Sequence, residues 1–306
     1  MTETVFRNGR IVLPDSIHDG DLVIRDGLVM ALDDAGIHRS GVDLDGDWLL
    51  PGLVELHTDH LEGHYAPRPR VRWNPVAAVQ AHDAQIASSG ITTVFDALRV
   101  GTDDDSTLGA EDMRTLAGAI AESQERGRLR ADHFIHLRCE VAAPDVMEAF
   151  VAFDNKPRVR IVSLMDHTPG QRQFTSLDAY RAFYQDKKGM SDEELQAFFA
   201  QRRSHTEETA GRNRQAIAEM SRHRRIVLAS HDDATADHVA EAIAIGVTIA
   251  EFPTTREAAA ASHTAGLKVL MGAPNIVRGG SHSGNIAARD LARSRVLDIL
   301  SSDYFP

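Results

Sequence analysis

The chain has 306 residues, of which 42% are hydrophobic and 25% charged, the profile of an ordinary soluble globular protein with one large domain, or a large and a small one. Its formal net charge of −12 argues against non-specific nucleic-acid binding but allows a small anionic substrate held by local cations. No apolar run reaches the roughly 18 residues of a membrane span, so we expect no membrane partner.

Cysteine usage and the N-terminus both favour a cytoplasmic protein. Cys139 is the only cysteine, which excludes an intrachain disulfide and suits a reducing compartment. The first residues, Met-Thr-Glu-Thr-Val-Phe-Arg-Asn, lack the basic and then apolar layout of a secretory signal. A homodimer is the default assembly. The 15 histidines are a high number for this length and allow a metal site.

Residues 1–48 predict a small β-unit. Short strand-like runs alternate with the turn signals Asn8-Gly9, Asp19-Gly20 and Asp26-Gly27. The expected strands are Thr4–Phe6, Arg10–Leu13, Asp21–Ile24 and Leu28–Leu32. We expect them to form an antiparallel unit of about four strands, too short to bury a generous core by itself.

Residues 49–306 predict a parallel (β/α)₈ barrel of the TIM type. Eight β-branched runs alternate with helix-like stretches, and Gly90, Gly246 and Gly266 stand where helix C-caps are expected. The expected strands are Leu49–His57, Ile91–Ala97, Phe134–Glu140, Val159–His167, Arg225–Asp232, Val247–Pro253, Lys268–Ala273 and Leu297–Asp303. The expected helices include Met113–Glu125, Ala236–Ala244 and Arg256–Ala265.

Two further features bear on this fold. An open doubly wound sheet is the competing architecture, but its nucleotide-binding version carries Gly-x-Gly-x-x-Gly after the first strand, and this chain has no such motif there. The segment from Gln171 to His223 is longer than one crossover needs, so we expect a helical excursion over one rim of the barrel.

Ligand-type side chains gather at the ends of five predicted strands, where such barrels build their active sites. A lone histidine or an isolated His-x-Asp at a strand end is more often an ordinary polar feature, and Glu140 alone could equally form a salt bridge at the rim, but the whole set predicts a dinuclear site for divalent ions such as Zn or Mn. Its expected ligands are His57, Asp59, Glu140, His167, His231 and Asp303. Two cations that share the Glu140 carboxylate activate a bridging water as hydroxide, and Asp303 is the expected general base.

A second group of residues predicts contacts with a phosphorylated substrate. The glycine-rich loop after the seventh strand offers backbone amides and side-chain donors. Further cations and donors stand on other strands and loops, and His60 is expected to contact substrate or to support the ligands. The expected substrate-binding residues are His60, Arg68, Arg138, Arg172, Arg278, Gly280, Ser281 and His282.

The sequence resembles the amidohydrolase superfamily and, closely, its phosphonate-metabolism branch. The resemblance rests on Trp48–Glu62, Pro67–Pro69, Ser89–Asp96, His136–Glu140, Val162–Phe174, Ala229–Thr235, Ala250–Thr255, Met271–Asn285 and Asp298–Tyr304. It implies hydrolysis of α-D-ribose 1-methylphosphonate 5-triphosphate, or an alkyl analogue, to the 5-phosphate and diphosphate. It also implies Zn or Mn at the six ligands above, and work alongside the carbon–phosphorus lyase machinery.

Two departures from the superfamily pattern stand out. The first strand ends in His57-Thr58-Asp59, as in the phosphonate branch, where other members have His-x-His. The chain also stops at Pro306, whereas relatives add a final helix and strands that complete a composite β-sandwich with residues 4–47. We therefore expect an incomplete sandwich and a last barrel strand without its covering helix.

Two other functions stay open on the sequence. A cyclic-amidase or deacetylase type of amidohydrolase would keep the metal site but act on an uncharged substrate, which has no need of the donors from Arg278 to Asn285. A non-catalytic, metal-stabilised scaffold subunit is the third reading, and the intact candidate ligands on five strands argue against it.

Overall fold

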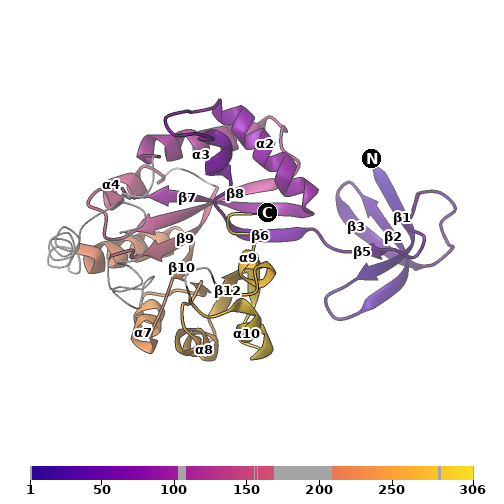
Figure 1. Cartoon of the computed structure of the whole chain (residues 1–306). Coiled ribbons are helices and arrows are strands. Elements are labelled where there is room, and N and C mark those ends of the chain that lie inside the picture. The colour runs from indigo at the N-terminus through magenta and orange to yellow at the C-terminus, as the bar shows by residue number, and fades with distance from the viewer. Residues whose placement is uncertain are drawn as a thin grey trace. The chain divides into compact units, whose positions relative to one another are not determined.

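The structure, a computed structural model, describes residues 2–102, 108–154, 156, 158–168, 209–281 and 284–305. The chain divides into two compact units, Met1–Leu53 and Val54–Pro306, each built around its own sheet (Figure 1). In the described ranges no helix combines the length and the apolar character that crossing a membrane requires.

The first unit is a five-stranded mixed sheet. Its strands are β1 (Glu3–Val12), β2 (Ile17–Arg25), β3 (Leu28–Asp34), β4 (Val42–Asp43) and β5 (Trp48–Leu49). β1 and β3 pair with β2 in antiparallel fashion, whereas β4 and β5 both pair with β1 in parallel. The prediction of an antiparallel unit is therefore wrong, because β4 and β5 run in the same direction as β1.

Only one of the three turn signals in this unit joins two strands. Asp26 and Gly27 have φ of +50° and +81° and connect β2 to β3. Asn8-Gly9 instead lies inside β1 at a bulge, with φ of +55° at Asn8. Gly20 lies inside β2, where a Cβ atom would stand 2.2 Å from the carbonyl oxygen of Asp33. Gly20 therefore allows the backbones of two neighbouring strands to approach closely. The hairpin turns expected at Asn8-Gly9 and Asp19-Gly20 are wrong, because both pairs lie inside strands.

The second unit is a nearly closed barrel of parallel strands with helices between them, as predicted. The strands found in its described residues are β6 (Leu53–Thr58), β7 (Ile91–Val100), β8 (Asp132–Glu140), β9 (Val159–Met165), β10 (Val227–His231), β11 (Ile249–Glu251), β12 (Lys268–Gly272) and β13 (Ile299–Ser301). They are hydrogen-bonded in the order β13-β12-β11-β10-β9-β8-β7-β6. A parallel bridge between Thr58 and Asp303 brings the last strand back to the first.

The first barrel strand is shorter than the sequence suggested. The expected strand Leu49–His57 is divided between the two units, with Trp48–Leu49 paired to β1 and a new strand beginning at Leu53. Pro51-Gly52 separates the two pieces, because proline has no amide hydrogen for a sheet ladder and glycine weakens a strand interior.

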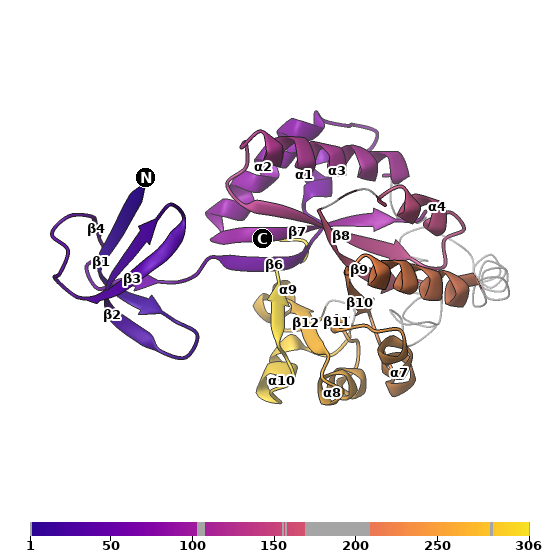
Figure 2. The same cartoon turned by 180° about the vertical axis from the view of Figure 1, so that it is seen from behind.

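The helices cover the outside of the barrel (Figures 1 and 2). They are α1 (Leu61–Tyr65), α2 (Pro75–Ser88), α3 (Ala110–Glu125), α4 (Val146–Val151), α7 (Ala236–Ala244), α8 (Arg256–Thr264), α9 (Ala273–Val277) and α10 (Ala288–Arg293). Residues 209–223 are also helical, while 171–208 of the expected excursion lie outside the described residues. The three expected helices are confirmed. Gly90, Gly246 and Gly266 have φ of +80°, +87° and +87°, as C-cap glycines do.

The core lies between the strands and the helices. The outward face of β8 buries Ile135, Leu137 and Cys139 against Leu116 of α3 and Phe150 of α4. Because side chains alternate along a strand, the polar residues between them point to the barrel interior. The polar side chains of β8 therefore line the barrel interior up to the rim, where the parallel strands end.

Candidate active site

The ends of the first and last barrel strands hold His57 and Asp303 next to each other. The Asp303 amide donates to the carbonyl oxygen of His57 at 3.1 Å, and the Asp59 amide donates to the carbonyl oxygen of Asp303 at 3.3 Å. A Cβ atom on Gly272, at the end of β12, would lie 3.1 Å from Oδ2 of Asp303. The glycine therefore leaves the space that the Asp303 carboxylate occupies.

His57 is held from behind by a buried carboxylate. Its Nδ1 lies 3.1 Å from Oε1 of Glu251, and both side chains are 1% exposed. Burial, followed by the charge of Arg138, places the pKa of His57 well below its ordinary value, so the ring is neutral. With Nδ1–H donating to Glu251, the lone pair remains on Nε2, the atom available to a metal.

A second group joins the ends of β8, β9 and β10. His167 Nδ1 lies 2.9 Å from Oε2 of Glu140, while its Nε2 lies 3.9 Å from Oδ2 of Asp232. The ligand atoms of His167, His231 and Asp232 all lie within 4.8 Å of one another. Among the described residues, the buried Nε2 atoms of His167 and His231 have no hydrogen-bond partner. Two buried lone pairs that converge in this way fit a cation.

Carboxylates of the same site repel one another in the absence of a cation. Burial and then the charge of Asp59 raise the pKa of Asp303 to about 6. Arg138 lies close by, with Nη1 donating to Oδ2 of Asp59 at 3.0 Å. Carboxylate oxygens and imidazole nitrogens gathered in one place form a donor set that fits divalent metal ions.

The structure adds two residues that sequence reasoning missed. Glu251 ends the short strand β11, and its signal was a single carboxylate inside the apolar run Ile249–Pro253. Asp232 follows His231 with φ of +58°, a backbone turn that brings its carboxylate beside the ring. His136, which shares the inward face of β8, is satisfied by the carbonyl oxygen of Leu56 and by Ser163 and is therefore not available as a ligand.

A cavity of about 230 Å³ joins the ligand group to the glycine-rich loop. His57, His231 and Asp303 line one part of it, and Arg278, Gly280 and Ser281 line another. Arg138 also lines this cavity. The arrangement sets anion-binding donors beside the candidate metal ligands in one space.

The remaining predicted substrate contacts lie elsewhere or cannot be placed. His60 packs against His64 and His82 and does not line the cavity. Arg68 is exposed in the loop after α1 and likewise does not line it. Arg172 and His282 lie outside the described residues.

Comparison with known proteins shows a similarity that extends over nearly the whole chain. The alpha-D-ribose 1-methylphosphonate 5-triphosphate diphosphatase of Escherichia coli (strain K12) is 46% identical over 303 residues, which cover 99% of this chain and 80% of that protein. The imidazolonepropionase of Methylobacterium nodulans is 24% identical over 153 residues, 46% of this chain and 37% of that one. No protein-family model matches the chain.

Solved structures share the fold at low sequence identity. The 5-methylcytosine deaminase of Klebsiella pneumoniae has a TM-score of 0.57 at 13% identity, covering 99% of this chain and 76% of that one. An amidohydrolase from an environmental sample of the Sargasso Sea has a TM-score of 0.56 at 13% identity, covering 99% and 69%. These likenesses concern the fold alone.

Proposed function

We propose that this chain, which belongs to the PhnM family of α-D-ribose 1-methylphosphonate 5-triphosphate diphosphatases, hydrolyses that triphosphate to the 5-phosphate and diphosphate. The observation that carries the proposal is the cavity shared by His57, Asp303 and the donors Arg278 and Ser281. A phosphoric anhydride hydrolase needs this combination, because the substrate is a polyanion and the attacked atom is phosphorus.

We propose two divalent ions, Zn or Mn, as the cofactors. The residues that would hold them are His57, Asp59, Glu140, His167, His231 and Asp303, with Asp232 added by the structure. The two unpartnered Nε2 atoms of His167 and His231 support this assignment. When bound, the ions supply an acidified water and offset the negative charge of the phosphates.

Asp303 is the proposed general base. Water attacks phosphorus and forms a new P–O bond while the anhydride bond to diphosphate breaks, and the proton of the water passes to the Asp303 carboxylate. Hydrogen bonds between the backbones of Asp303, His57 and Asp59 hold the carboxylate at the mouth of the barrel. A fixed position lowers the entropic cost of reaching the transition state.

Arg278, Gly280 and Ser281 are proposed to bind the phosphates. Arg278 reaches across to the hydroxyl of Tyr304 at 3.4 Å, next to the base at Asp303. Gly279, with φ of +83°, turns the backbone so that the loop can approach an anion. Arg138, tied to Asp59, adds a cation on the same cavity. Contacts from His60, Arg68, Arg172 and His282 stay predictions of the sequence.

The test is release of diphosphate from the ribosyl triphosphate by the full chain, before and after chelation. Asp303→Asn is expected to lower kcat by about 10²–10⁴-fold while the metal content stays measurable. Asp290→Asn, a carboxylate on the surface helix α10, is the matched control and is expected to keep full activity. Undiminished turnover after chelation would contradict the metal sites, and turnover of a dihydropyrimidine with none of the triphosphate would favour the amide hydrolase.

A cytoplasmic location and a homodimer remain predictions of the sequence. Size-exclusion chromatography with light scattering at several concentrations tests the assembly.

A further inference from the structure

Three histidines cluster outside the cavity, around the turn that follows β6. His60 precedes α1, His64 lies on α1 and His82 lies on α2. Each offers one ring nitrogen within 4.8 Å of those of the other two. Their ring centroids are 4.9, 5.9 and 6.2 Å apart. A tetrahedral ion with metal–nitrogen bonds of about 2.0 Å sets its imidazole centroids about 5 Å apart, so the rings already stand near that spacing.

The second nitrogen of two of these rings is fixed by an acceptor. His82 Nε2 lies 2.8 Å from Oδ1 of Asp96, and His64 Nε2 lies 3.2 Å from Oε1 of Gln85. A neutral imidazole that donates through Nε2–H carries its lone pair on Nδ1, so these contacts direct the Nδ1 atoms toward a ligand.

Two of the three rings have a buried nitrogen without a hydrogen-bond partner in the part of the chain that the structure describes. The first is Nδ1 of His82, whose side chain is fully buried. The Nδ1 atom of His60 is buried in the same way. Because buried polar atoms in native proteins are nearly always paired, these two nitrogens indicate a ligand between the rings.

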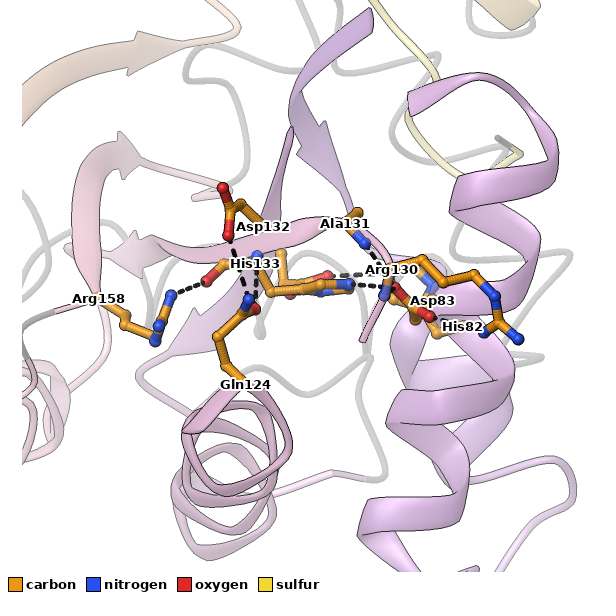
Figure 3. A network of polar contacts seen from close by, with 9 residues as sticks. His82, Asp83, Gln124, Arg130, Ala131, Asp132, His133 and Arg158 are labelled. Carbon is orange, nitrogen blue, oxygen red and sulfur yellow. Dashed lines mark hydrogen bonds and ion pairs between the residues drawn. The ribbon is translucent and has the colours of Figure 1, made fainter. Parts of the chain in front are cut away.

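The acceptor of His82, Asp96, also contacts His133, which lies with Asp83 and Arg130 in a network of polar contacts (Figure 3). His133 Nδ1 lies 2.8 Å from Oδ2 of Asp96, and His133 Nε2 lies 3.4 Å from Oδ1 of Asp83. The Asp83 carboxylate in turn accepts from the backbone amides of Arg130 and Ala131. Asp96 is thus held in place as an anion, and a carboxylate that orients a histidine from behind is the usual outer support of a metal ligand.

We propose that His60, His64 and His82 form a second site for a divalent cation, bound through three imidazole nitrogens. Three neutral nitrogen donors with no carboxylate among them favour Zn²⁺ or its neighbours Co²⁺, Ni²⁺ and Cu²⁺ over Mg²⁺ or Ca²⁺. Three protein ligands leave the fourth position of a tetrahedral ion to a water. The ion would tie α1 and α2 to the turn that carries Asp59, whose neighbour in the chain is His60.

Co²⁺ binding to the full chain tests the proposal, because tetrahedral Co²⁺ absorbs visible light. The variant His64→Asn is expected to bind one Co²⁺ per chain fewer than the wild type. His223→Asn, at an exposed histidine, is the matched control and should bind the wild-type number. His231→Asn removes a ligand of the proposed catalytic group instead, so a Co²⁺ absorption band that is lost in His64→Asn but kept in His231→Asn belongs to the new site. Gln85→Ala should weaken that site about tenfold.

A direct measurement keeps the test independent of the variants. Anomalous diffraction from wild-type crystals grown with Zn²⁺ should show a peak between the three rings. Absence of that peak, or an equal number of Co²⁺ ions with unchanged affinity in folded His64→Asn, would overturn the proposal.

Discussion

The amide of Asp303 donates a 3.1 Å hydrogen bond to the carbonyl oxygen of His57, and this contact joins the last strand of the barrel to the first. The candidate base and a candidate metal ligand thus lie at one seam, the contact between the first and last strands of the barrel. Glu55 strengthens it, with Oε1 accepting from the His57 amide at 2.8 Å and Oε2 accepting from the Ser302 amide at 2.6 Å. The position of the candidate base therefore depends on closure of the barrel.

Replacement of Glu55 should open this seam. Glu55→Ala leaves the amides of His57 and Ser302 without their charged acceptor, at a cost of about 2–3 kcal/mol in unfolding free energy. Activity should fall by more than the loss of folded protein explains, because the candidate base Asp303 follows Ser302 directly. Thermal denaturation and diphosphate release measure the two effects. Wild-type behaviour in both would show that the carboxylate does not hold the strands together.

Gly272→Ala should displace the base without unfolding the protein. Its Cβ would stand 3.1 Å from Oδ2 of Asp303 in a backbone with φ of −70°, so the conflict is with the carboxylate and not with the backbone. A displacement of this kind is expected to lower kcat by about tenfold or more. Gly118→Ala on α3, where a Cβ has open space, is the control and should keep full activity. Equal kcat values for the two variants would contradict the prediction.

Arg278→Ala should weaken substrate binding more than chemistry. Arg278 lines the cavity at the glycine-rich loop, so the substitution is expected to remove the proposed charge-assisted contact to a phosphate. We expect KM for the triphosphate to rise about 10- to 100-fold with a smaller change in kcat. Arg293→Ala, on the surface of α10, is the matched control. A fall in kcat at unchanged KM would assign Arg278 to the transition state.

The His133 network should make stability depend on pH in a defined direction. Burial opposes its protonation, but Asp96 and Asp83 outweigh it and raise the pKa of His133 to about 9. Because the pKa of His133 is raised in the folded state, its protonated ring stabilises the fold. This contribution of roughly 3 kcal/mol to the unfolding free energy is fully present below pH 6.5 and is lost as pH rises through 9. Burial alone would raise the pKa of Asp96, but its histidine partners hold it at about 2, so the contribution of Asp96 is lost only as pH falls toward 2.

Urea unfolding of wild type and His133→Gln at pH 6 and pH 9.5 measures this effect. The variant should be less stable at pH 6 by a few kcal/mol, because two buried carboxylates lose their cation, and the difference should shrink at pH 9.5. His223→Gln serves as the exposed control. A difference that stays constant with pH would mean that His133 is neutral in the folded protein.

Local pattern was sufficient for most of the fold. Strand and helix periods, together with capping glycines such as Gly90 and Gly246, placed the barrel strands and the expected helices, because these signals act within a few residues. The same local signals failed in the first unit, where Asn8-Gly9 forms a bulge and not a hairpin. A turn motif specifies a backbone conformation, and only pairing with a partner strand decides how that conformation is used.

The order of residues along each strand is enough to predict which side chains reach the rim, because alternation sends His57, Glu140 and their counterparts to the inner face. The partners of these side chains follow from the fold instead. Glu251 supports His57 and Asp96 supports His82 through contacts between elements far apart in the chain, and no local period encodes such a meeting. The barrel brings the strand ends together in space, so the chemistry of the site is set by closure between β6 and the end of β13.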